Sequence, residues 1–194
     1  MLAAMYDRLG TARALLMTPD INIRIVSVVG MSALDWACKC GNVALVRELM
    51  NRGAKVRLAR GWVGATSLVL AAEQGHGHVV RELMARGVDI NAVEVDASDR
   101  TPLISATCRG SAAGISVLVE CGADVNAQTP ISRKTALIKA AEHGNRTCVV
   151  ALLAVPGINL TLTDSEGLTA LHWARRLGHD AIVIMLAGAE RTET

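Results

Sequence analysis

The residues of this chain that could do chemistry are five histidines and five cysteines, and two short stretches bring several of them together. The stretch HGH covers positions 76 to 78, and the stretch CKC covers positions 38 to 40. Imidazole and thiolate groups are ligands that zinc prefers, but a closed zinc site needs four of them, paired as C-x₂₋₄-C or H-x₃₋₅-H. Neither pairing is present, so we predict no metal site and no cofactor.

The cysteines are an odd number and lack the spacing of a disulfide framework: Cys38, Cys40, Cys108, Cys121 and Cys148. Asp7, Arg8 and Arg13 interrupt the apolar N-terminal stretch, which is therefore not typical of a secretory signal peptide. We expect reduced thiols and a cytoplasmic or nuclear location. Two of the cysteines, Cys38 and Cys148, fall on apolar positions and are predicted to be small core residues.

The other function classes that a sequence can reveal are also missing. The chain has no phosphate-binding GxxxxGK[ST], no GxSxG turn and no HExxH, so we predict that it is not an enzyme. Its net charge is +2, and arginine alternates with glutamate, as in Arg47-Glu48, which is typical of a solvated helix face rather than a nucleic-acid surface. The apolar run 181–189 is far shorter than the ~20 residues of a membrane span, so no membrane insertion is expected.

Glycines recur at intervals of 34 or 35 residues, at positions 41, 75, 110, 144 and 178. A serine or threonine opens each of these units: Ser32, Thr66, Thr101, Thr135 and Thr169. Such a residue caps a helix by accepting a hydrogen bond from a free N–H, and the glycine ends that helix in the left-handed conformation. Two apolar pairs four residues apart, such as 45–46 and 49–50, follow and predict a second helix with one apolar stripe.

These units resemble ankyrin repeats, a family with a period of about 33 residues and a T-P-L-H-x-A stretch. The stretches TPLISA (101–106) and GLTALHWA (167–174) carry the resemblance, which covers nearly the whole chain. It implies an all-α solenoid of stacked helix-turn-helix units with β-turn fingers, inner helices on a concave face and outer helices on the convex back. One helix pair cannot bury its apolar stripe alone, whereas stacked pairs can.

The repeat frame predicts the organisation of the chain. Residues 1–26 match only the second half of a unit and are expected to be a partial N-terminal repeat, either a worn cap or part of a longer array. The run Leu186–Ala189 stops early before a polar tail, which favours a C-terminal cap. The five full repeats are expected at 27–59, 60–93, 94–128, 129–163 and 164–194, the last including that cap.

Three tryptophans stand out in a chain without phenylalanine. Trp62 lies in GWVG (61–64), at the expected tip of a finger, and either packs over Val28 and Val29 or is presented to a partner. We favour presentation, because tryptophan and arginine dominate binding hot spots. Trp36 and Trp173 take equivalent places on inner helices and are predicted to pack in the core or on the groove floor.

The expected protein-binding groove combines finger tips with the ends of inner helices. On this surface six cations, at 39, 100, 109, 134, 139 and 176, face three glutamates, at 73, 142 and 166. The residues that we expect to bind a partner are Val28, Val29, Lys39, Trp62, Val63, Glu73, Arg100, Arg109, Lys134, Lys139, His143 and Arg176.

The partner is expected to be a protein or peptide with two portions. An apolar portion would lie near residues 28–29 and Trp62, and an acidic portion near Arg100, Arg109 and Lys134, where the charge would set register and on-rate. The alternative is a solvated groove with incidental charge.

A modification is implied by a further resemblance. LMARGVDIN (83–91) and LVECGADVN (118–126) resemble the ankyrin stretch in which an oxygenase of animal cells hydroxylates the terminal asparagine. Asn91 and Asn126 would be the targets, and an ordinary structural role in a turn is the alternative.

The sequence therefore predicts a non-enzymatic scaffold or adaptor that binds a protein through its concave face. The alternative is the ankyrin portion of a larger protein, which regulates an attached enzyme, channel or effector domain by intramolecular docking. Val150 and Ile184 fall on outer-helix positions where Arg47 and Arg81 stand earlier. Apolar surface at these positions and at the partial first repeat leaves self-association open.

Overall fold

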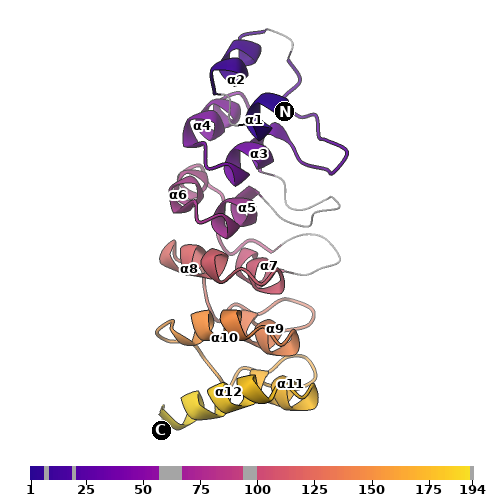
Figure 1. The fold of residues 1–194 in the computed structure, drawn as a ribbon, viewed down its shortest axis with the longest axis vertical. Helices are drawn as coiled ribbons and strands as arrows, with labels where there is room; N and C mark the ends of the chain where they lie inside the picture. The colour runs from indigo at the N-terminus through magenta and orange to yellow at the C-terminus, as the bar shows by residue number, and fades with distance from the viewer. Residues whose placement is uncertain (7–8, 19–20, 57–66, 94–99, 193–194) are drawn as a thin grey trace.

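The structure is a computed structural model that describes residues 1–6, 9–18, 21–56, 67–93 and 100–192. These residues form helices and no strand, and the helices stack in pairs into one elongated column (Figure 1). The helices are α1 (Leu2–Met5), α2 (Leu9–Leu16), α3 (Ala33–Lys39), α4 (Val43–Asn51), α5 (Ser67–Glu73), α6 (Gly77–Ala85), α7 (Pro102–Cys108), α8 (Ala112–Glu120), α9 (Ala136–Glu142), α10 (Arg146–Leu153), α11 (Ala170–Arg176) and α12 (Asp180–Thr192). The fold is the predicted all-α solenoid.

The odd-numbered helices are the inner helices, and their ends follow the predicted signals. The hydroxyl of Thr101 accepts a hydrogen bond from the N–H of Ile104 at 3.3 Å, and Pro102 takes the first helical position, where a missing N–H costs nothing. Ser32, Thr135 and Thr169 cap their helices in the same way. The glycine that follows each inner helix from α3 to α11 has a positive φ, between 66° and 76°, and the chain turns there into an outer helix.

The even-numbered helices are the outer helices, and each pair buries its apolar stripe against the next pair. Both predicted apolar pairs of this stripe contribute a buried residue in each of the five full repeats: Val46, Val80, Ile115, Val149 and Ile182 from the first pair, and Leu49, Leu83, Leu118, Leu152 and Leu186 from the second. Burying a leucine side chain contributes roughly 1.5–3 kcal/mol. The core is therefore a continuous spine rather than a central globule.

The described fingers are tight turns between one outer helix and the next inner helix. In the first finger, Val26 and Ser32 form an antiparallel bridge, and the N–H of Ser27 donates to the carbonyl of Met31 at 2.8 Å. In the last finger, the N–H of Asp164 donates to the carbonyl of Leu168 at 3.0 Å. These bonds fix the tips relative to the inner helices.

The first pair is the shortest. α1 has four residues, whereas the other inner helices have seven. α1 packs on α3, and α2 packs on α4, so that Ala3 and Ala4 are buried as Ala140 and Ala141 are. Each expected unit holds one helix pair, and the exact unit boundaries stay predictions.

The last helix is longer than the other outer helices, which have eight or nine residues. α12 continues through Ala189 to Thr192. Outer helices such as α6 end at a left-handed glycine, Gly87, four residues after the buried Leu83. The same position after Leu186 holds Glu190, which favours a further helical turn over a left-handed stop.

Candidate protein-binding face

The candidate site is the face made by the fingers and the ends of the inner helices, here called the inner face. Each inner helix from α3 to α11 packs on the next one, which brings the ends of these helices into one row. The predicted groove residues in this row are Lys39, Glu73, Arg109, His143 and Arg176. His143 is exposed, and its Nδ1 lies 2.8 Å from the carbonyl oxygen of Lys139.

Much of the charge on the inner face is paired within the protein. Glu73 forms an ion pair with Arg109, which connects α5 to the end of α7. Glu166, in the last finger, accepts a hydrogen bond from Arg176 at 3.0 Å. Burial raises the pKa of Glu73 above its ordinary value, against the opposing effect of the Arg109 guanidinium. An acidic partner would have to compete with these glutamates for the same cations.

Lys134 differs most from the expectation, because its side chain is buried and not presented to a partner. Its exposed fraction is 8%. Its ammonium donates to Glu142 at 2.8 Å and lies 3.9 Å from the centre of the Trp173 ring. Lys139 donates to the other carboxylate oxygen of Glu142 at 2.9 Å. Lys134 therefore connects two repeats, and its positive charge is paired with Glu142 within the protein.

The reason lies in the position that directly precedes the inner-helix cap. In the first and last full repeats this position holds Met31, which is buried, and Leu168, which is partly buried. Arg100 occupies the same position and is also partly buried. The repeat packs this position against the core, and a lysine placed there needs a partner for its charge.

Trp173 lies at the centre of this cluster. It is 8% exposed, as the sequence predicted for a core or floor residue, and its indole N–H donates to Asp164 at 2.7 Å. Asp164 is buried and also accepts from the backbone N–H groups of Glu166 and Leu168. Trp36, at the equivalent place in α3, is only partly buried and has Lys39 5.2 Å from the centre of its ring.

Because of this cluster, the free energy of unfolding is expected to fall as the pH is lowered. Burial alone would raise the pKa of Glu142, but its hydrogen bonds from Lys134 and Lys139 bring it below the ordinary value. A pKa lower in the folded state than in the unfolded state gives stability that is present above the unfolded value, roughly 4.3 for glutamate, and lost as pH falls through the folded value. Between about pH 6 and about pH 3, we expect wild type to lose more free energy of unfolding than Glu142→Gln.

Urea denaturation of both proteins across this range measures the difference. The pKa of Asp164 is also lowered, because hydrogen bonds from Leu168, Trp173 and Glu166 outweigh the raising effect of burial. Asp164 is present in both proteins, so its contribution to the pH dependence is the same in each. The comparison therefore isolates Glu142. Equal pH slopes for the two proteins would show that Glu142 is not held in its charged form.

Apolar side chains are exposed at the tips of two described fingers. Val28 is fully exposed, Val29 is 48% exposed, and Ile131 of the fourth repeat is 80% exposed. The predicted anchor Trp62 and its neighbour Val63 lie outside the described residues. Presentation of Trp62 to a partner, and the alternative that it packs over the first finger, therefore both stay predictions.

The HGH stretch contacts the end of α3, at and directly after the CKC stretch, and so connects one repeat to the next. The Nε2 atom of His76 lies 3.2 Å from the carbonyl oxygen of Lys39, and that of His78 lies 2.9 Å from the carbonyl oxygen of Gly41. Cys38 and Cys148 are buried, as predicted. Within the described ranges, no three histidines, cysteines or acidic residues are placed to hold a metal ion, and no helix is long and apolar enough to cross a membrane.

Asn91 and Asn126 each connect one turn to the next. The side-chain oxygen of Asn91 accepts a hydrogen bond from the N–H of Asp124 at 2.9 Å. The side chain of Asn126 accepts from the N–H of Asn159 at 2.8 Å and donates to the carbonyl of Gly157. Both amides have a structural role, and their hydroxylation stays a prediction that mass spectrometry of native protein tests through the mass of one added oxygen.

Sequence reasoning did not include Asp164 in the site, although it holds Trp173 and the last finger. The available signal was its position nine residues before Trp173, in a DSEG turn that predicts an aspartate bound to its own backbone. Ile131 is a further exposed finger residue that is not among the predicted binding residues. Its exposed fraction, 80%, lies between those of Val29 and Val28 on the first finger.

Comparison with known proteins agrees with this geometry. A family model described as three copies of ankyrin repeats matches residues 58–129 and 126–193, and a model of a single ankyrin repeat matches residues 29–58. Alpha-latrotoxin-Lg1a of Latrodectus geometricus is 31% identical over 152 residues, which are 78% of this chain and 10% of the toxin.

Two further relatives match shorter parts. The ankyrin repeat domain-containing protein SAT10 of Stachybotrys chartarum is 38% identical over 86 residues, 41% of this chain and 4% of that protein. The probable E3 ubiquitin-protein ligase XBOS34 of Oryza sativa subsp. japonica is 38% identical over 96 residues, 48% of this chain and 18% of that protein. The chain thus spans a small part of these curated relatives. With the family matches and the stacked helix pairs together, the chain belongs to the ankyrin repeat family.

Proposed function

We propose that this chain is a non-enzymatic scaffold or adaptor that binds a protein partner through its finger tips and inner face. Ankyrin repeats are in general protein–protein interaction modules without catalytic activity. The observation that carries the proposal is the exposure of Val28, Val29 and Ile131 on fingers whose backbone is fixed by hydrogen bonds. Exposed β-branched side chains on a rigid loop lose little conformational entropy on binding.

The apolar portion of the partner is expected at the first finger. We expect Val28→Asp combined with Val29→Asp to weaken partner binding by about tenfold or more, because two carboxylates would be buried in an apolar contact. Both side chains are exposed, so the fold should not change. Affinity capture from the native cell, with wild type and this variant, measures the effect, and Trp62→Ala forms a second arm for the predicted anchor.

The control is Ile184→Asp, which introduces one carboxylate at an exposed apolar residue of the outer face. It should capture the same partner as wild type. Equal capture by the Val28 and Val29 double variant, or loss of capture with Ile184→Asp alone, would contradict binding through the fingers.

The acidic portion of the partner is a weaker feature of the proposal. Of the three cations expected near the acidic portion, Lys134 is buried and Arg100 is partly buried. The charge test is therefore best made at Arg109, which is the more exposed partner in its ion pair with Glu73. We expect Arg109→Gln to reduce the salt dependence of binding, since rim charges act mainly on on-rate and register. Binding measured against salt with the captured partner gives the slope. A slope equal to that of wild type would rule out an acidic portion at this place.

The second candidate function is regulation of a domain attached to the repeats in a longer protein. It is supported by the lengths of the relatives, of which this chain spans between 4% and 18%. The full open reading frame separates the two candidates. An attached domain that binds the purified repeats, but does not bind the first-finger variant, would favour intramolecular docking. We expect the protein in the cytoplasm or nucleus, where its five thiols would stay reduced.

A further inference from the structure

Large apolar side chains are exposed mainly at the N-terminal end of the column. Nine of the thirteen that the described residues expose belong to residues 1–29. Val28 and Val29 are on the finger that the proposed function uses. The other seven lie on or beside the first helix pair: Met1, Leu2, Tyr6, Leu15, Met17, Ile25 and Val26. We call the surface around α1, α2 and residues 21–26 the end face.

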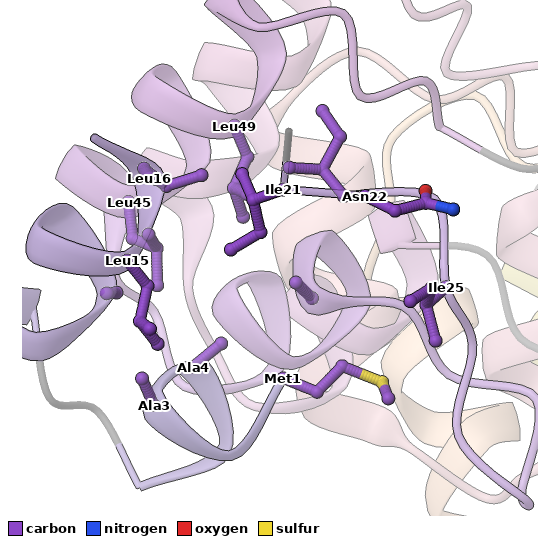
Figure 2. A pocket seen from close by; sticks show the side chains of 13 residues that line it. Met1, Ala3, Ala4, Leu15, Leu16, Ile21, Asn22, Ile25, Leu45 and Leu49 are labelled. Carbon is purple, nitrogen blue, oxygen red and sulfur yellow. The ribbon is translucent and has the colours of Figure 1, made fainter. Parts of the chain in front are cut away.

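The end face holds an apolar pocket of about 220 Å³. Figure 2 shows its side chains converging from α1, α2, α4 and the connection at residues 21–25. Leu45 and Leu49 form its inner wall, and Leu15 and Ile25 lie at its more exposed side. Among the described residues that line it, Asn22 is the polar one. The pocket exists because the one-turn helix α1 covers less of α3 and α4 than a seven-residue inner helix would.

The size of the pocket indicates what would fill it. Small-molecule sites typically measure roughly 300–1,000 Å³, and a cavity of about 150 Å³ holds a benzene ring. A volume of 220 Å³ therefore suits one or two bulky aliphatic side chains rather than a whole ligand. Its walls are mostly helices, which is the arrangement that receives the apolar stripe of a partner helix.

Charge beside the pocket indicates the chemistry of that partner. An adjoining pocket of about 360 Å³ shares Ile23 with the first and includes Arg24 and Lys55, which are both exposed. In the described part of residues 1–56 the carboxylates are those of Asp35 and Glu48. Asp35 is buried and accepts hydrogen bonds from two serines, and Glu48 pairs with Arg52 four residues along its own helix.

The described part of the end face is therefore apolar with cations beside it. A second copy of the chain would bring like charges together, whereas an acidic partner would complement them. We propose that the end face binds an amphipathic helix of a partner protein, which inserts one or two aliphatic side chains into the pocket and places aspartate or glutamate near Arg24 and Lys55. This goes beyond the proposed function, because it uses the end of the solenoid rather than the fingers and the inner face.

Two synthetic helical peptides of about 18 residues test this proposal. Both carry the same leucine stripe, and one has glutamate and the other lysine beside it. Titration into the full chain, followed by methyl NMR, should shift the signals of Ala12, Leu15 and Ile25. We expect the glutamate peptide to bind at least about tenfold more tightly than the lysine peptide. The double variant Arg24→Glu with Lys55→Glu should reverse this preference.

The pocket itself is tested by Ile25→Glu, which changes a side chain that is 53% exposed and should not disturb folding. It should weaken binding of the glutamate peptide by about tenfold or more, whereas Ile184→Glu should leave binding unchanged. Equal binding of both peptides, or no shift at these methyl groups, would overturn the proposal. A dimer in sedimentation that Ile25→Glu dissociates would also overturn it, in favour of a second copy. The Val28 and Val29 variant tests the proposed function separately.

Discussion

The Trp173→Ala variant is expected to lose about 3–5 kcal/mol of the free energy of unfolding. The indole is buried, and its removal leaves a cavity between the last two repeats. Its N–H also donates to Asp164 at 2.7 Å, and its ring lies under the ammonium of Lys134 at 3.9 Å. The variant would leave the buried Asp164 and Lys134 with one contact fewer each, and this loss adds to the free-energy cost of the cavity.

Urea denaturation followed by circular dichroism measures the loss, with the terminal repeat allowed to unfold separately because a solenoid can open from its ends. Trp36→Ala is the matched control, since Trp36 takes the equivalent place but is only partly buried. It should cost clearly less. Trp173→Phe should keep much of the packing and lose the hydrogen bond to Asp164. Equal losses for Trp36→Ala and Trp173→Ala would contradict the buried cluster.

The second large effect is expected at Gly41. Its φ is +76°, and an added Cβ would lie 2.7 Å from the ring of His76 in the next repeat. Gly75 has the same φ of +76° but open space around it. A left-handed alanine costs roughly 1–2 kcal/mol, and crowding in a packed place costs about 1–3 kcal/mol more. We expect about 1–2 kcal/mol of lost stability for Gly75→Ala and about 2–5 kcal/mol for Gly41→Ala.

The difference between the two variants measures the contact between repeats, because the backbone strain is common to both. Removing the ring with His76→Ala should relieve part of the cost of Gly41→Ala. The double variant should therefore lose less free energy of unfolding than the sum of the losses of the two single variants. Thermal or urea denaturation of the four proteins gives these values. A strictly additive double variant would show that His76 does not pack on Gly41.

The fold could be predicted because it is encoded locally and repeatedly. The hydroxyl of Thr101 starts a helix, and the glycine at 110 ends it. The apolar stripe that follows specifies a second helix, and none of these signals depends on distant residues. The burial of Trp173 and Cys148 follows from their positions in that frame. Exposure of Val150 and Ile184 on the outer helices, at 51% and 73%, was also predictable from the arginines at the equivalent positions.

The site was less predictable, because its chemistry depends on which side chains meet between repeats. Counting charges gave an excess of cations, but Glu73, Glu142 and Glu166 each bind cations of the same face. The charge count treats Lys134 as a surface residue, whereas its repeat position is that of Met31, which is buried and so indicates burial. The end pocket could not be predicted from the sequence, because it results from the small part of α3 and α4 that the short α1 covers.

The most direct test of the central claim is a photo-crosslinking measurement in the native cell. A benzophenone amino acid is placed singly at Val28, at Ile131 and, on the outer face, at Ile184, all of which are exposed. Binding through the fingers and inner face predicts that the same partner crosslinks from Val28 and Ile131 and not from Ile184. Crosslinks from Ile184 with none from either finger would contradict it.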